Sequence, residues 1–163
     1  MPLENRIDKI LFHSKHWQLF LIFLAACALQ TFVMKVPVVT LFIVVIYLPV
    51  LGFRLRKYLP ASYSLAYNIF LIASVVDAVS FVYILGFMPP TGTFWVNLTA
   101  AALFISYVTV LSFVARAIKS LETHDRATVN DYFVDIILLM VFFPIGMWFL
   151  QPRLNLLGDQ FYR

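Results

Sequence analysis

The chain has 163 residues, of which 63% are hydrophobic and only 12% are charged. Soluble globular domains carry roughly twice that share of charge, so the composition excludes an ordinary soluble fold and predicts one membrane domain in contact with the lipid bilayer. The formal net charge of +4 does not indicate nucleic-acid binding, because the basic residues lie singly or in threes beside apolar runs, as topology determinants do.

The N-terminal segment 3–17 combines apolar and charged positions at helical spacing. One face carries Leu3, Ile7, Ile10, Leu11 and Trp17, while the acidic and basic residues lie elsewhere. This pattern predicts an amphipathic helix on the cytoplasmic leaflet, with docking of a partner protein as the alternative. No cleavable signal peptide is predicted, because a full-length apolar run follows without a small-residue cleavage site.

Five apolar runs follow, and the gaps between charged residues are close to the length that a helix needs to cross a bilayer. The break between the first two runs is Lys35-Val36-Pro37, and the break between the third and fourth is the turn signal 86–92. The sequence therefore predicts an all-α polytopic transmembrane helix bundle of about five spans, roughly 17–34, 37–53, 64–87, 94–115 and 133–150.

Orientation is predicted from the distribution of Lys and Arg. Only Lys35 lies on one side of the predicted spans. Nine basic residues lie on the other side: Arg6, Lys9, Lys15, Arg54, Arg56, Lys57, Arg116, Lys119 and Arg126. Because cytoplasmic loops are enriched in Lys and Arg, we expect a cytoplasmic (inner) membrane protein with its N-terminus in the cytoplasm.

The last apolar run raises a specific question, because it contains Pro144 and Gly146 and meets a polar segment at Gln151-Pro152-Arg153. It either crosses the bilayer as a kinked helix or turns back inside it. We expect it to cross, since proline and glycine are tolerated in a membrane helix that packs on neighbours. The helix is then expected to end at 151–153.

Asp77 is the main candidate for a functional residue, because a carboxyl group in the middle of a span usually faces the bundle interior. Ser74 and Ser80 lie three residues before and after it, and the fourth span offers Ser106 and Thr109. One interpretation is a proton or cation site between the two helices. The other is hydrogen bonding that holds the helices together or contacts a partner chain.

Other chemistry has little support in the sequence. His13 and His16 share a helical face but lack an evident third ligand, so no metal site is predicted. Cys27 is expected to be a small buried apolar side chain. The chain lacks the motifs of metalloproteases, serine hydrolases and nucleotide-binding loops, so we expect neither an enzyme nor a bound cofactor.

The segment 142–155 reads FFPIGMWFLQPRLN, and LFHSKHWQLFL, at 11–21, lies near the start of the first predicted span. These segments resemble those of a group of small uncharacterised bacterial inner-membrane proteins that end in FFPIG-WF-QPR-N. The resemblance covers about the last fifth of the chain and one short N-terminal piece. It implies a multi-spanning membrane protein and assigns no functional residues.

Two hypotheses of function follow. The first is a non-enzymatic assembly or interaction subunit of a membrane complex, acting with a protein partner or as a homo-oligomer, because so little of the chain lies outside the predicted spans. The second is a small channel or a proton- or ion-coupled transporter that uses Asp77. No inverted repeat, the usual sign of a transporter, is visible between the early and late spans.

Overall fold

The computed structural model describes residues 38–87, 94–141 and 143–161, together with isolated positions between 18 and 28. All regular structure in these residues is helical, which confirms the predicted all-α class for this part of the chain. The helices are α3 (Val38–Leu55), α4 (Ser64–Phe87), α5 (Phe94–Thr123), α6 (Val129–Val141) and α7 (Phe143–Phe161), with short 3-10 helices η2 (Arg56–Tyr58) and η3 (Ala61–Tyr63).

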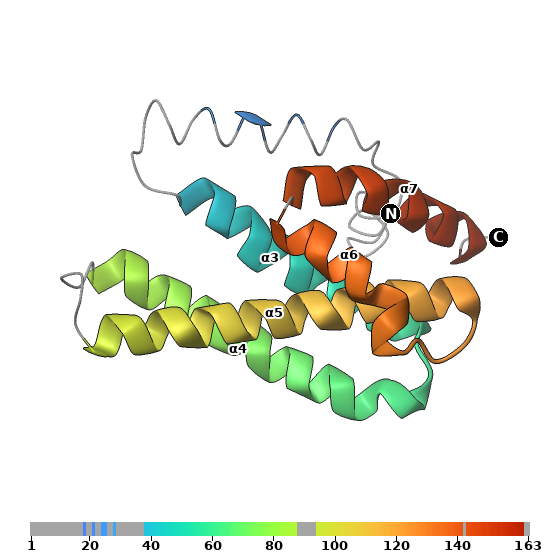
Figure 1. Ribbon diagram of the computed structural model, residues 1–163, viewed down its shortest axis with the longest axis horizontal. Coiled ribbons are helices and arrows are strands. Elements are labelled where there is room, and N and C mark those ends of the chain that lie inside the picture. Colours follow the sequence, from blue (N-terminus) through green and yellow to red (C-terminus); the bar gives the residue numbers. More distant parts are fainter. Residues whose placement is uncertain are drawn as a thin grey trace, which may run out of the picture.

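Helix α5 is the centre of the described fold and contacts α3, α4, α6 and α7. It lies side by side with α4 along its length, and α6 and α7 cover the half of α5 nearer its C-terminus (Figure 1). At 30 residues, α5 is about 45 Å long. It is eight residues longer than the predicted span 94–115, because the charged segment that follows Ala115 remains helical up to Thr123.

Two segments, Ala61–Tyr83 and Phe94–Thr123, are long and apolar enough to cross a membrane. Only 28% of the apolar window in the first and 33% of that in the second is buried inside the protein. A core helix of a soluble protein of this apolarity would be mostly buried, so the exposed apolar surface needs another apolar environment.

The two faces of α4 explain this exposure. Its outer face carries large aliphatic side chains that are each at least 50% exposed: Leu65, Ile69, Ile72, Val75, Val79 and Val82. The exposed polar residues of α4, Ser64 and Asn68, lie in its first two turns. Its inner face carries the only polar groups buried on this helix, Asp77 and Ser80, between Phe70, Ala73 and Phe81. From Ile69 to Val82, the outside of α4 is therefore more uniformly apolar than the inside, the reverse of a soluble helix.

The core between α3, α4 and α5 is built on a close helix approach at Gly52. A methyl group on Gly52 would lie 2.6 Å from Cζ of Phe70, so the missing side chain is what lets the Phe70 ring reach the backbone of α3. Phe70 stacks in turn on Phe113 of α5, with ring centroids 4.5 Å apart. This contact ties α3, α4 and α5 together.

The last apolar run forms two helices, so the expectation of a single kinked helix over 133–150 is corrected. Helix α6 ends at Val141 and α7 begins at Phe143. Pro144 falls in the first turn of α7, where its missing N–H costs nothing, whereas in a continuous helix it would interrupt the hydrogen-bond ladder. The expected end at Gln151-Pro152-Arg153 is also wrong, because α7 continues through Pro152 to Phe161.

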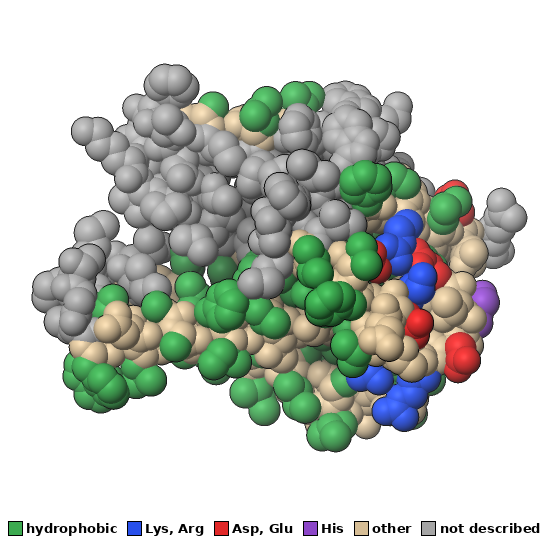
Figure 2. Space-filling model, in the orientation of Figure 1, with side chains coloured by type: hydrophobic (Ala, Val, Ile, Leu, Met, Phe, Trp, Pro, Cys, Tyr) green, Lys and Arg blue, Asp and Glu red, His purple; other side chains and the backbone are tan. Residues whose placement is uncertain are grey.

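The described charged residues gather at one end of the protein, where α3 ends, α4 begins, and α5 meets α6 (Figure 2). Apart from Asp77, they belong to the segments 54–57, 116–135 and 153–159. We call this region the charged end. The C-terminal half of α7 also lies at this end, which places Arg153 beside Glu122, in the segment between Lys119 and Arg126 that is predicted to be cytoplasmic.

Several expectations concern residues outside the described part of the chain. These are the amphipathic helix over 3–17, nearly all of the first predicted span, the pair His13 and His16, and Cys27. The bounds of α4 coincide with those of the third predicted span, and α3 is close to the second.

Candidate functional site

Asp77 lies in the interface between α4 and α5 and is only 1% exposed. The hydroxyl of Ser106 on α5 donates a hydrogen bond of 2.5 Å to Oδ1 of Asp77. Among the described residues, no Lys or Arg side chain forms an ion pair with this carboxyl group. The interface therefore contains one acidic group whose main partner is a neutral hydroxyl.

The surroundings of the Ser106 hydroxyl allow two arrangements of protons. Its oxygen also lies 2.8 Å from the carbonyl oxygen of Ala102 and 3.0 Å from that of Leu103, but a hydroxyl has one proton to donate. With an ionised carboxylate, Ser106 donates across the interface. With a protonated carboxyl, Asp77 donates to Ser106, which then donates to its own helix. The link between α4 and α5 is kept in both cases.

The other predicted members of this site play separate roles. Ser74 donates to the carbonyl oxygen of Phe70, four residues earlier on α4, at 2.9 Å. Thr109 donates in the same way to Ile105 on α5, at 2.8 Å. Ser80 is buried in the same interface as Asp77. Of the five predicted residues, the structure therefore joins only Asp77 and Ser106 directly.

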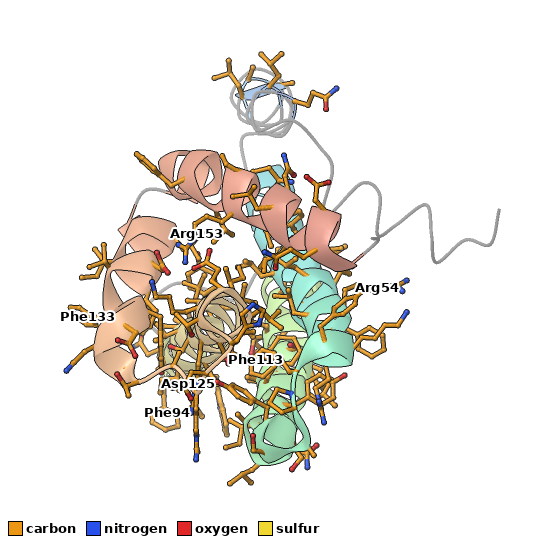
Figure 3. All side chains as sticks on the ribbon, turned by 90° about the vertical axis from the view of Figure 1, so that its right-hand side faces the viewer. Arg54, Phe94, Phe113, Asp125, Phe133 and Arg153 are labelled. Carbon is orange, nitrogen blue, oxygen red and sulfur yellow. The ribbon has the colours of Figure 1, made fainter. Side chains whose placement is uncertain are left out.

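A second polar contact joins three helices at the charged end. The Arg153 guanidinium on α7 donates to both carboxylate oxygens of Glu122 on α5, at 2.5 and 2.7 Å, and to Oδ1 of Asp135 on α6, at 2.7 Å. The three side chains are between 17 and 25% exposed. Figure 3 shows Arg153 directed into the space between α7, α6 and α5. We call this contact the Arg153 clamp.

The Arg153 clamp keeps its cation charged. Hydrogen bonding to Glu122, and then to Asp135, raises the pKa of the Arg153 guanidinium although its partial burial acts in the opposite direction. The two-pronged contact with Glu122 is the geometry that a planar guanidinium makes best with a carboxylate. The Arg153 guanidinium thus stays positively charged where it joins α7 to α5 and α6.

Sequence reasoning missed the Arg153 clamp because its residues are far apart in the chain. Glu122 and Asp135 precede Arg153 by 31 and 18 residues, so no local spacing links them. It also missed Gln151, which is fully buried and whose Oε1 accepts a hydrogen bond of 3.3 Å from the Tyr47 hydroxyl on α3. The available signal was a Gln directly after an apolar run, since a buried amide must find a partner.

The turn between α5 and α6 is fixed by local hydrogen bonds. His124 follows the last residue of α5 with φ of 54°, the left-handed conformation common just after a helix end. The Ser120 hydroxyl donates to the carbonyl oxygen of Asp125 at 2.6 Å. At the start of α6, Thr128 donates its backbone N–H and its hydroxyl to Oδ2 of Asp131, both at 2.7 Å, which caps the helix.

No cluster of three or more His, Cys, Asp or Glu residues that could hold a metal ion occurs in the part of the chain that the structure describes. No protein family, curated protein or solved structure matches this chain. The fold and its polar contacts therefore define only a class: an all-helical protein with two helices long and apolar enough to cross a membrane.

Proposed function

We propose that the protein is an integral membrane subunit that assembles with another protein or with itself through the apolar outer faces of its helices. In this proposal α3, α4 and α5 cross the bilayer, the run 17–34 forms a further span, and α6 and α7 form a hairpin that enters and leaves at the charged end. The charged end faces the cytoplasm, and the membrane is the inner membrane.

The observation that carries the proposal is how the buried polar groups are used. Asp77 bonds Ser106, the Tyr47 hydroxyl bonds Gln151, and Arg153 bonds two carboxylates, each time between helices. These groups hold the bundle together. The outer faces of α4 and α5 take no part in these contacts. Their large exposed apolar side chains can pack on lipid or on another membrane helix.

Three findings support the hairpin and its orientation. Helix α6 has 13 residues and is about 20 Å long, which is less than the ~30 Å of hydrocarbon that a crossing helix must span. The Arg153 clamp ties α7 to Glu122, at the same end of α5 from which the chain enters α6. Every described Lys and Arg lies in 54–57, 116–126 or at Arg153, all at the charged end, which favours a cytoplasmic position for it.

The test is photo-crosslinking in native membranes combined with purification in mild detergent. A photoreactive residue replaces Val79 on α4 or Ile105 on α5, both exposed in the apolar faces, and a control replaces Asn130, which is exposed at the start of α6. The proposal expects one discrete adduct from Val79 or Ile105, absent from Asn130, with the same protein retained through purification. A monomer without adducts from either apolar face would reject it.

A second function, proton- or ion-coupled transport, is favoured by one observation. The contact between Asp77 and Ser106 can persist whether the carboxyl is protonated or ionised, as the bonding around the Ser106 hydroxyl allows. Transport through this site predicts proton flux in reconstituted vesicles that is abolished by Asp77→Asn, with the folded protein retained. Flux indistinguishable between the wild type, Asp77→Asn and empty vesicles would eliminate this function and leave Asp77 with a role in helix packing.

A further inference from the structure

A cleft of about 570 Å³ lies at the charged end, between the connection from α3 to α4 and the connection from α5 to α6. Lys57 and Tyr63 line it from the first connection, and His124, Asp125 and Arg126 line it from the second. Its volume falls within the range of ligand-binding pockets. The cleft is remote from Asp77, whose contact lies farther along the interface of α4 and α5.

A smaller hollow of about 340 Å³ adjoins this cleft and is lined by Arg116, Arg126 and the first turn of α6. Arg126 lines both spaces, so the two are neighbours. The Arg116 guanidinium lies over the ring of Tyr63, 5.1 Å from its centroid. Lys57, Arg116 and Arg126 therefore surround one region from three different parts of the chain.

Two buried polar atoms in this region lack a hydrogen-bond partner: the Tyr63 hydroxyl and Nε of Arg116. They are the only such side-chain atoms that the described residues contain. Tyr63 is 2% exposed, and leaving a buried donor unpaired costs about 1–3 kcal/mol. Tyr63 lines the larger cleft and Arg116 the smaller hollow, so both unpaired donors belong to residues that border the two adjoining spaces.

The charge of the region favours an anion. Among the described residues, neither Lys57, Arg116 nor Arg126 forms an ion pair with a carboxylate. Asp125 supplies one negative charge to the lining, but its Oδ1 accepts the backbone N–H of Arg126 at 2.6 Å. The Asp131 carboxylate accepts from Thr128, which lines the smaller hollow, so three cations face two carboxylates and the region stays positive. Guanidinium groups match the oxygens of phosphate well.

We propose that the cleft binds a phosphate group, with Lys57, Arg116 and Arg126 supplying positive charge and Tyr63 donating a hydrogen bond. The phosphate belongs either to the headgroup of an anionic phospholipid or to a soluble phosphate compound. Basic pockets between helices on the cytoplasmic side of membrane proteins recognise such headgroups. This inference goes beyond the proposed assembly role and does not depend on it, since phosphate binding can be measured on the isolated protein.

The test compares matched variants of the full-length protein in detergent. The site variant is Lys57→Gln with Arg126→Gln, and its control is Lys119→Gln with Arg54→Gln, which removes the same charge from residues outside the cleft. Figure 3 shows Arg54 pointing away from the bundle. Affinities for short-chain phosphatidylglycerol, short-chain phosphatidylcholine and inorganic phosphate are measured by microscale thermophoresis, at constant ionic strength.

We expect the site variant to lose at least about tenfold in affinity while the control variant stays near the wild type. Binding of phosphatidylglycerol alone assigns the site to a lipid headgroup, binding of inorganic phosphate alone assigns it to a soluble compound, and binding of both assigns it to the phosphate itself. If neither binds, or if the two variants lose affinity equally, the site is rejected.

Tyr63→Phe provides a second test that does not alter charge. Because the Tyr63 hydroxyl has no partner in the free protein, its removal should leave the thermal unfolding midpoint unchanged or slightly raised. Affinity for the bound anion should fall several-fold. Unchanged affinity in this variant would overturn the assignment of Tyr63 to the site, and with it the proposed geometry.

Discussion

Replacing Arg153 by Met removes the cation of the Arg153 clamp and keeps most of the aliphatic stem. The substitution deletes three hydrogen bonds, two to Glu122 and one to Asp135. It also leaves two carboxylates close together without the cation between them. Since these bonds join α7 to both α5 and α6, in addition to the apolar packing of Leu150, Leu154 and Leu157, their loss should loosen the hairpin.

The size of the effect follows from the burial of the clamp. Hydrogen bonds to charged groups contribute about 1.5–3 kcal/mol when buried, whereas exposed ion pairs contribute at most about 1 kcal/mol. The three side chains are 17–25% exposed, between these limits. We therefore expect Arg153→Met to lower the free energy of unfolding by about 2–3 kcal/mol, with roughly half of that coupled to Glu122 because of its two-pronged contact.

The assay is reversible unfolding in mixed detergent and SDS micelles, followed by circular dichroism, for Arg153→Met, Glu122→Gln and the double variant. The control is Arg54→Met, which removes a cation that points away from the bundle. A loss for Arg153→Met that does not exceed the control, or additive effects of the two clamp substitutions, would refute the argument that the clamp holds the hairpin.

Gly52→Ala should destabilise the fold by about 1–3 kcal/mol in the same assay, because the new methyl would lie 2.6 Å from the ring of Phe70; an unchanged midpoint would contradict the close approach. The Thr128 hydroxyl, and then the Thr128 backbone N–H, donate hydrogen bonds that lower the pKa of Asp131. The Asp131 cap therefore stabilises the fold above the unfolded pKa of about 3.9, and this stabilisation is lost as the pH falls through the lower folded pKa. Amide hydrogen exchange at the start of α6 should become faster over that fall in pH. In Asp131→Asn the exchange rate should show no such step. In a variant without the native cysteine, a new cysteine is placed either at Gln160 or in the segment 124–128. Both new cysteines should react with an impermeant maleimide from the same side of the membrane. Labelling of the two positions from opposite sides would exclude the hairpin.

The helices of the first part of the fold were predictable because charge gaps and turn residues mark them in the sequence. The third predicted span shares its bounds with α4, between the segment that ends at Tyr63 and the turn signal that starts near Gly86. The partnership of Asp77 with the fourth predicted span was also predictable, since a buried carboxyl needs a nearby polar group. Spacing alone could not select Ser106 over Thr109, because both lie in the same apolar helix and their rotation depends on how α5 packs.

The last part of the fold was not predictable in the same way. Pro144 and Pro152 are both compatible with a kinked helix or with a new one, and tertiary contacts decide between these outcomes. Pro144 starts α7, whereas Pro152 lies within it, flanked by Gln151 and Arg153, which both bond to other helices. Those contacts outweigh the lost backbone hydrogen bond at Pro152, and no local pattern in the sequence reports them.

The return of α7 to the charged end also has a consequence for biosynthesis. In a chain whose last helix crossed the bilayer, the Arg153 guanidinium would have to pass through the hydrocarbon layer, where an Arg at a helix centre costs about 2.5–3.5 kcal/mol. In the proposed topology α6 and α7 begin and end on one side of the membrane, so this cation can stay in the aqueous compartment where it was synthesised. In that topology the hairpin can dock as a late, separate step, after the proposed spans α3, α4 and α5 have inserted into the bilayer.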